Sequence, residues 1–123
     1  MLLVEDNDIN AEIACLVLSS FGVSAERAGN GREGLEQVQN HGAGYYDAVL
    51  MDIQMPVMDG YEATRAIRAL EGEYYKTLPI LAMSANAYDQ DVTDCLAAGM
   101  NAHIAKPFTP EGLRKALDEQ IVK

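Results

Sequence analysis

The chain has 123 residues, which is enough for one domain with a single core and too few for two. Its net charge of −10 disfavours direct binding to nucleic acid, whose phosphates it would repel, and favours cations and basic partner surfaces. No apolar run approaches the ~20 residues of a membrane-spanning helix, and Glu5 and Asp6 stop the apolar opening at once, so neither a membrane span nor a signal peptide is expected. Cys15 and Cys95 fall at apolar positions of helical patterns, which predicts two reduced core thiols.

Short apolar stretches alternate with helical patterns along the whole chain. In chain order we expect a strand over Met1–Val4, a helix over Asp8–Phe21, a strand over Ser24–Ala28, a helix over Arg32–Gln39, a strand over Ala48–Met51, a helix over Gly60–Leu70, a polar connection over Glu71–Thr77, a strand over Ile80–Met83, a helix over Ala87–Ala98, a strand over Ala102–Ala105 and a last helix starting at Thr109–Pro110. The strands are wholly apolar, as in a parallel sheet covered on both faces. This order predicts a doubly wound α/β fold: a five-stranded parallel sheet with helices on both faces.

Helical periodicity predicts which side chains of the helices face the core. In the first helix, Asp8 is the expected N-cap, and the apolar stripe comprises Ile9, Ile13, Leu16 and Val17. In the helix over Ala87–Ala98, the stripe comprises Tyr88, Val92, Cys95 and Leu96. Ile9 and Ile13 also lie at the end of their helix nearest the strand ends, so they are either core residues or a docking surface for a partner.

Polar side chains follow four of the five predicted strands. They are Glu5 and Asp6 after the first strand, Asp52 after the third, Ser84 after the fourth and Lys106 after the fifth. The carboxyl ends of parallel strands meet at one edge of the sheet, which is where open α/β sheets bind their ligands. We therefore expect three carboxylates, a hydroxyl and an ammonium group to share a small volume.

The three carboxylates repel one another unless a cation compensates their charge. A set of oxygen ligands of this kind suits Mg²⁺, with Mn²⁺ as a possible substitute. We expect Asp6 and Asp52 to bind the ion directly, the backbone carbonyl of Gln54 to be a third ligand, and Glu5 to act through water. Zinc is not expected, because the two histidines lack further ligands at suitable spacing.

An aspartate carboxylate is a competent nucleophile toward phosphorus and forms an aspartyl phosphate. Catalysis of phosphoryl transfer depends mainly on positioning and charge neutralisation. We expect Asp52 to accept the phosphoryl group, Lys106 to pair with one of its oxygens, and the Ser84 hydroxyl to donate a hydrogen bond to another.

This set of residues resembles the receiver domain of two-component response regulators, which has the CheY-like, flavodoxin-like fold, over essentially the whole chain. The motifs that carry the resemblance are Val4–Asn7, Met51–Gly60, Ser84–Ala85 and Lys106–Pro107. The resemblance implies that Asp52 is the phosphoacceptor, Glu5 and Asp6 the acidic pair, Ser84 the switch hydroxyl and Lys106 the conserved-type lysine. Gly60 and Pro107 are expected to have structural roles, and the bond before Pro107 resembles one that is cis in the family.

The motifs around Asp6 and Asp52 look most like those of receivers in hybrid sensor histidine kinases. Residues 1–123 are then expected to be a single receiver domain cut from a larger cytoplasmic or membrane-anchored protein, a self-phosphorylating phosphoacceptor rather than a turnover enzyme. The implied partners are a histidine kinase or a histidine phosphotransfer domain, with a homodimer as a further possibility. A stand-alone single-domain regulator is the alternative.

The position of the family's switch aromatic corresponds here to His103, which departs from the common Tyr or Phe. We expect Ser84 to move toward the phosphate and His103 to fill the vacated space. This would repack the face formed by the helix over Ala87–Ala98, the strand over Ala102–Ala105 and the last helix. Gln54 and Asn86 occupy the positions that flank the phosphoryl group in receivers and are expected to tune its lifetime.

Three other readings compete with the receiver. A haloacid-dehalogenase-like phosphatase carries a second Asp two positions after its nucleophile, where this chain has Gln54, which cannot transfer protons. A nucleotide-binding fold needs a glycine-rich loop after the first strand, where this chain is acidic. A degenerate receiver used only for protein contacts would not need the complete set of acidic and basic residues.

Overall fold

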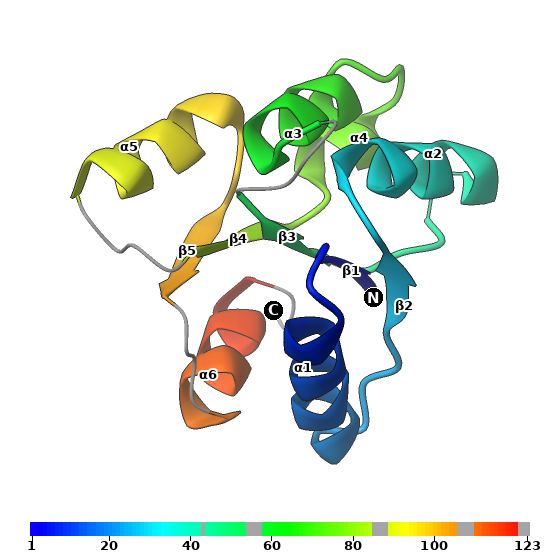
Figure 1. Cartoon of the computed structure of the whole chain (residues 1–123). Coiled ribbons are helices and arrows are strands. Elements are labelled where there is room, and N and C mark those ends of the chain that lie inside the picture. Colours follow the sequence, from blue (N-terminus) through cyan, green and yellow to red (C-terminus); the bar gives the residue numbers. More distant parts are fainter. Residues whose placement is uncertain (43, 54–57, 85–88, 106–109, 121–123) are drawn as a thin grey trace.

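The computed structural model describes residues 1–42, 44–53, 58–84, 89–105 and 110–120 (Figure 1). Its elements are β1 (Leu2–Val4), α1 (Asp8–Ser20), β2 (Glu26–Ala28), α2 (Gly31–His41), β3 (Val49–Asp52), α3 (Gly60–Arg68), α4 (Glu73–Thr77), β4 (Ile80–Ser84), α5 (Asp89–Ala98), β5 (Ala102–Ala105) and α6 (Pro110–Gln120). The alternation of strands and helices follows the prediction, with one difference. The polar connection before β4 contains the short helix α4.

The five strands form one parallel sheet in the order β2-β1-β3-β4-β5. Helices α1 and α6 cover one face of this sheet, and α2, α3, α4 and α5 cover the other (Figure 1). The predicted doubly wound α/β fold is confirmed. The register pairs Val4 with Met51 and Asp52 with Met83, so the carboxyl ends of β1, β3 and β4 lie next to one another.

The core has two layers because successive residues of a strand point to opposite faces of the sheet. Leu2, Val49 and Met51 belong to the layer beneath α2, α3 and α5, whereas Leu3 and Leu50 belong to the layer beneath α1 and α6. All five side chains are fully buried, and each contributes about 1.5–3 kcal/mol through its removal from water. Burial of both faces explains why the central strands are apolar at every position.

The predicted core stripe of α1 is wrong at Leu16, and of the two alternatives left open for Ile9 and Ile13 the core position is excluded. Ile9, Ile13 and Leu16 are 69%, 50% and 66% exposed. The helix instead buries a second stripe, Ala11, Ala14 and Leu18. Two alanines on this stripe let the helix lie close to the sheet, and the bulkier residues are left on the outside. Sequence periodicity could not distinguish the two stripes, because both recur at helical spacing.

The N-cap of α1 is Asn7 rather than the predicted Asp8. The Asn7 side chain accepts the Asn10 N–H at 2.9 Å, and Asp8 is the first helical residue, where a carboxylate favours the positive end of the helix dipole. Asp8 also forms an ion pair with Arg27 at 2.7 Å.

Leu96 of α5 is a further departure, because it is 57% exposed, whereas its neighbour Cys95 is buried as predicted. Tyr88 lies outside the described residues.

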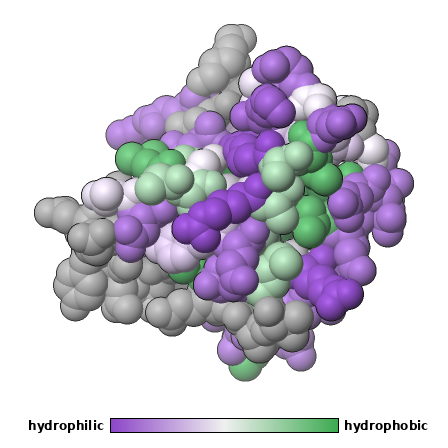
Figure 2. Space-filling model, turned by 90° about the horizontal axis from the view of Figure 1, so that it is seen from above, coloured by the Kyte–Doolittle hydropathy of each residue, from purple (hydrophilic) through white to green (hydrophobic). Residues whose placement is uncertain are grey.

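Figure 2 shows the face covered by α2 to α5, where hydrophilic side chains predominate and apolar patches are scattered among them. Neither cysteine forms a disulfide in the described part of the chain, where no helix is long and apolar enough to cross a membrane either.

Candidate functional site

Three carboxylates meet at the carboxyl edge of the sheet. Glu5 and Asp6 follow β1, and Asp52 is the last residue of β3. One carboxylate oxygen from each residue lies within 4.8 Å of the others. Glu5 and Asp52 are only 1% and 6% exposed, whereas Asp6 is exposed to solvent. The structure therefore brings together the three acidic residues that the sequence placed at the strand ends.

The backbone of Glu5 is held on both sides by β2. Its N–H donates to the Ala28 carbonyl at 3.1 Å, and its carbonyl accepts Nε and Nη2 of Arg27 at 3.1 and 2.9 Å. The Glu5 carboxylate accepts the Asn7 N–H at 3.3 Å, and Asn7 caps α1. The contacts of Arg27 and the capping role of Asn7 were not predicted from the sequence. The spacing of Asn7 and Asn10 was an available signal for the cap, but no local pattern indicated the contact of Arg27.

Asp52 is fixed by the return of the chain at the start of α3. Ile53 donates its N–H to the Met83 carbonyl at 3.1 Å, and its own carbonyl accepts the Gly60 N–H at 2.9 Å. A Cβ atom at Gly60 would overlap the carbonyl oxygen of Asp52 and lie 3.0 Å from the Ile53 Cα atom. Only glycine fits this close approach of two backbone segments.

Asp59 lies close in sequence to this site, and its role is to cap helix α3. Its carboxylate accepts the Glu62 N–H at 2.9 Å, and the Glu62 carboxylate accepts the Asp59 N–H at 3.4 Å. This capping box starts α3 and thereby fixes the position of Gly60.

Ser84 lies on β4, the strand next to that of Asp52, and His103 lies on β5, on the far side of β4. Ser84 ends β4 and pairs with Ala105, and His103 pairs with Ala82 one step deeper in the sheet. Paired residues project to the same face, and Ala82 packs in the layer beneath α5, so the half-buried His103 faces α5. Its Nε2 atom is buried and has no hydrogen-bond partner among the described residues. A buried polar atom without a partner destabilises the conformation that contains it by about 1–3 kcal/mol. A move of this side chain to another position therefore requires less free energy.

Four predicted site residues, Gln54, Asn86, Lys106 and Pro107, lie outside the described residues. Their roles therefore remain predictions from the sequence, as do those of the described site residues.

The donor set of the acidic group fits a hard divalent cation. Three carboxylates offer only oxygen ligands, and Mg²⁺ takes one or two carboxylates while retaining water. The exposure of Asp6 leaves solvent access on one side, and the burial of Glu5 and Asp52 fixes the other side.

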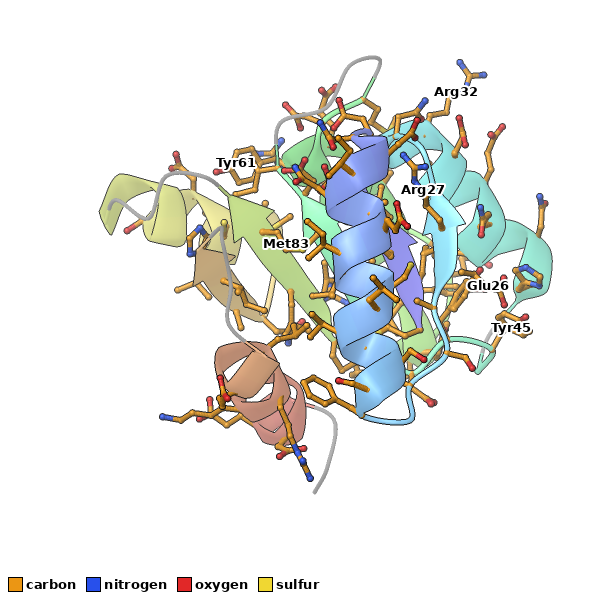
Figure 3. All side chains as sticks on the ribbon, turned by 60° about the horizontal axis from the view of Figure 1, so that its bottom comes forward. Glu26, Arg27, Arg32, Tyr45, Tyr61 and Met83 are labelled. Carbon is orange, nitrogen blue, oxygen red and sulfur yellow. The ribbon has the colours of Figure 1, made fainter. Side chains whose placement is uncertain are left out.

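A second polar cluster surrounds Glu26 at the start of β2, distant from the acidic site. The Glu26 carboxylate accepts the hydroxyls of Tyr45 and Tyr46, the latter at 3.2 Å, and lies 3.6 Å from His41 Nε2. Figure 3 shows Glu26 and Tyr45 on the same side of the molecule. The Tyr45 hydroxyl lowers the pKa of Glu26, and burial together with Glu26 raises the pKa of Tyr46. This cluster joins β2 to α2 and to the segment before β3.

Comparisons with known proteins agree with this geometry. Among curated sequences, the chain is 37% identical to hybrid signal transduction histidine kinase K of Dictyostelium discoideum over 98% of its own length and 10% of the relative. It is 40% identical to the peroxide stress-activated histidine kinase mak1 of Schizosaccharomyces pombe over 92% of its length and 7% of the relative. The chain thus spans about a tenth or less of the length of these two relatives.

Solved receiver structures superimpose on nearly the whole chain. The receiver domain of sensor histidine kinase PA1611 from Pseudomonas aeruginosa PAO1, with a magnesium ion in its active site cleft, matches with a TM-score of 0.87 and 40% identity, covering 99% of this chain and 96% of that one. The receiver domain of Saccharomyces cerevisiae Ssk1, crystallised with the histidine phosphotransfer protein Ypd1, matches with a TM-score of 0.84 and 28% identity over 98% and 86%.

The sequence model of the response regulator receiver domain matches residues 1–118. Together with the parallel five-stranded sheet and the acidic residues at its carboxyl edge, this match shows that the chain belongs to the response regulator receiver domain family of two-component signalling, and that it resembles the receivers of hybrid histidine kinases.

Proposed function

We propose that this domain accepts a phosphoryl group on Asp52 from a phosphohistidine and passes the signal on within a phosphorelay. The observation that carries the proposal is the grouping of Glu5, Asp6 and Asp52 within 4.8 Å at the carboxyl edge of the sheet. Asp52 is the member of this group that ends a central strand, and it is held in place by β4 and the start of α3.

Asp6 and Asp52 would hold Mg²⁺ directly, the Gln54 carbonyl would be a third ligand, and Glu5 would act through water; Mn²⁺ could substitute. The magnesium ion in the PA1611 receiver supports this assignment. When bound, the cation neutralises charge on the phosphoryl oxygens.

Each site residue has a separate role in the transfer of the phosphoryl group. An Asp52 carboxylate oxygen forms the new bond to phosphorus while the bond from phosphorus to the donor imidazole nitrogen breaks. The electron pair of that bond leaves with the imidazole, and the products are an aspartyl phosphate and a histidine. Lys106 pairs with one phosphoryl oxygen, and the Ser84 hydroxyl donates a hydrogen bond to another. Gln54 and Asn86 flank the group, and a charged residue at either position would change its rate of hydrolysis.

The switch that follows is a shift between two packings of α5, β5 and α6. Ser84 moves toward the phosphate, and His103 fills the space. The buried Nε2 of His103 supports this step, because this atom forms no hydrogen bond to any described residue that would hold it in its present place.

The partner docks on the exposed stripe of α1. Ile9, Ile13 and Leu16 present apolar surface on the helix that begins directly after the acidic turn. The helix has no basic residue in its last turn and carries Asp8 and Glu12 on its outside, so a partner with an apolar patch and a basic rim fits best. The similar Ssk1 receiver was crystallised with the histidine phosphotransfer protein Ypd1, which supports the same partner class here.

The chain as a whole is then a single receiver domain, residues 1–123, of a longer cytoplasmic-facing hybrid histidine kinase. A stand-alone regulator, alone or as a homodimer through the face of α5, β5 and α6, is the second arrangement. The length of the curated relatives supports the first.

Intact-mass spectrometry after incubation with Mg²⁺ and a small phosphodonor tests the chemistry. We expect one added phosphoryl group in the wild type, and none in Asp52→Asn or when Mg²⁺ is omitted. If no adduct forms, beryllofluoride separates the two explanations, because a stable complex indicates rapid hydrolysis. The absence of both adduct and complex contradicts the proposal.

A further inference from the structure

Arg27 of β2 contacts both ends of the turn that carries Asp6. Its Nε and Nη2 atoms donate to the Glu5 carbonyl at 3.1 and 2.9 Å, and Nη1 donates to Asp8 Oδ1 at 2.7 Å. Figure 3 shows Arg27 beside α1, on the side that faces β2 and α2. One planar guanidinium group thus joins the end of β1 to the first residue of α1.

The turn between these two contacts also has other hydrogen bonds. The Glu5 N–H is held by the Ala28 carbonyl, and the Asn7 N–H donates to the Glu5 carboxylate. Asp6 is exposed, so its carboxylate is positioned through the backbone of its neighbours rather than by packing. The geometry of the acidic group therefore depends on how rigidly Glu5 and Asp8 are held.

We propose that Arg27 is a positioning residue for the cation site, which sets the place of Asp6 relative to Asp52 by holding the Glu5 carbonyl and the Asp8 carboxylate. The inference rests on the proposed function, because it assumes that the acidic group binds a divalent cation. Groups that orient metal ligands without touching the metal change its affinity by about 10–100-fold when they are removed. Arg27 acts through backbone and helix contacts, so we expect the lower end of that range.

Charge alone predicts the opposite change in Mg²⁺ affinity when Arg27 is replaced. A guanidinium close to a cation site repels the cation, so its removal should strengthen Mg²⁺ binding if positioning were unimportant. The Asp8 carboxylate, 2.7 Å away, offsets this positive charge. The direction of the change in affinity therefore separates positioning from electrostatics.

The test is an Mg²⁺ titration of the whole chain. Binding is measured by calorimetry and by the NMR signals of the backbone amides in the acidic turn. Arg27→Met should raise the dissociation constant about tenfold. Arg27→Lys keeps the charge but cannot contact both acceptors with a planar group, and it should fall between Arg27→Met and the wild type. Arg32 is exposed and extends away from the body of the molecule (Figure 3), so Arg32→Met is the matched control for lost charge and should leave the affinity within about twofold of the wild type.

A second readout separates positioning from a general loss of structure. At saturating Mg²⁺, phosphorylation of Arg27→Met by the small phosphodonor should return to the wild-type level, with only the Mg²⁺ concentration for half-maximal rate increased. Thermal unfolding with EDTA establishes that each variant folds. If Arg27→Met does not fold, the Mg²⁺ affinity of Arg27→Lys relative to the wild type is the deciding measurement. Unchanged or tighter Mg²⁺ binding in the folded Arg27 variants overturns the inference and leaves the proposed function intact. Absence of Mg²⁺ binding in the wild type removes the proposed function itself.

Discussion

The backbone of Gly60 packs directly against the carbonyl group of Asp52, with no room for a side chain between them. The contact links the first residue of α3 to the last residue of β3, which is the proposed phosphoacceptor. Any substitution at Gly60 must therefore displace the backbone of Asp52 or the start of α3.

We expect Gly60→Ala to lower the free energy of unfolding by about 1–3 kcal/mol, because the added methyl group overpacks two backbone segments. Phosphorylation of Asp52 should also become slower. Urea unfolding and the intact-mass assay measure the two effects. Gly29→Ala is the control, since its added Cβ would meet only ordinary contacts with the Glu33 side chain. Equal stability of the two variants would contradict the close-packing argument.

The second prediction concerns Arg68, whose guanidinium group joins two separate segments, residues 75–78 and 99–101. It donates to the carbonyls of Gly99, Tyr75 and Leu78 at 2.8–3.0 Å and to the Asn101 side chain at 2.9 Å. Burial lowers the pKa of Arg68, but the group stays charged near neutral pH.

Arg68→Met should lower the free energy of unfolding by about 2 kcal/mol or more, because hydrogen bonds to a charged group are worth about 1.5–3 kcal/mol. Arg68→Lys should recover little of this loss, since an ammonium cannot reach acceptors on both sides of the planar group. Urea unfolding of the three proteins provides the measurement, and full recovery by lysine would show that charge matters here and geometry does not.

The third prediction is a gain in stability on replacing Thr64. Its side chain lies fully buried in α3, and its Oγ1 atom has no hydrogen-bond partner among the described residues. Thr64→Val replaces this hydroxyl by a methyl group of similar size, so we expect a gain of about 1 kcal/mol in the free energy of unfolding. Thr64→Ser retains the hydroxyl but loses the methyl contact, and it should be less stable than the wild type. A destabilised valine variant would indicate that the hydroxyl has a partner after all.

The cluster around Glu26 predicts a pH effect. The Tyr45 hydroxyl lowers the pKa of Glu26 below its ordinary value of 4.5. A carboxyl group whose pKa is lower in the folded state stabilises the fold above pH 4.5, and this contribution is lost as the pH falls through the lowered value.

Tyr45→Phe removes the hydrogen bond and with it this pH dependence. The wild type should therefore unfold at higher urea concentration than the variant at pH 6, and the difference should shrink as the pH is lowered below 4. Paired urea titrations across this range measure it. A difference that is the same at every pH would mean that Tyr45 contributes only by packing, in part through its stacking on His41.

The exposed stripe of α1 provides the last prediction. Replacing both Ile9 and Ile13 by serine should change the free energy of unfolding by less than about 0.5 kcal/mol, because both side chains are exposed on the surface of the helix. Phosphorylation by a small phosphodonor should be unchanged, whereas transfer from a phosphorylated histidine phosphotransfer protein, with yeast Ypd1 as the probe, should be slowed about tenfold or more. Leu96→Ser, at an equally exposed apolar position on α5, is the control. Equal transfer rates in all three proteins would exclude α1 as the docking surface.

The sequence alone determined the order of the five strands and the five longer helices, and the residues at the strand ends. Strands that are apolar at every position, such as β3, can only be buried on both faces, and parallel strands must present their carboxyl ends at one edge. These two local facts were enough to predict that Glu5, Asp6 and Asp52 converge.

The tertiary structure alone decided which face of α1 is buried and what holds the acidic turn. Both apolar stripes of α1 have helical spacing, and only the distance to the sheet selects Ala11 and Ala14 over Ile9 and Ile13. The contact of Arg27 with Glu5 joins residues 22 positions apart through the pairing of β1 with β2. Periodicity is a property of one element, whereas burial and long-range contacts depend on how several elements pack, and that information is not present in any single stretch of the chain.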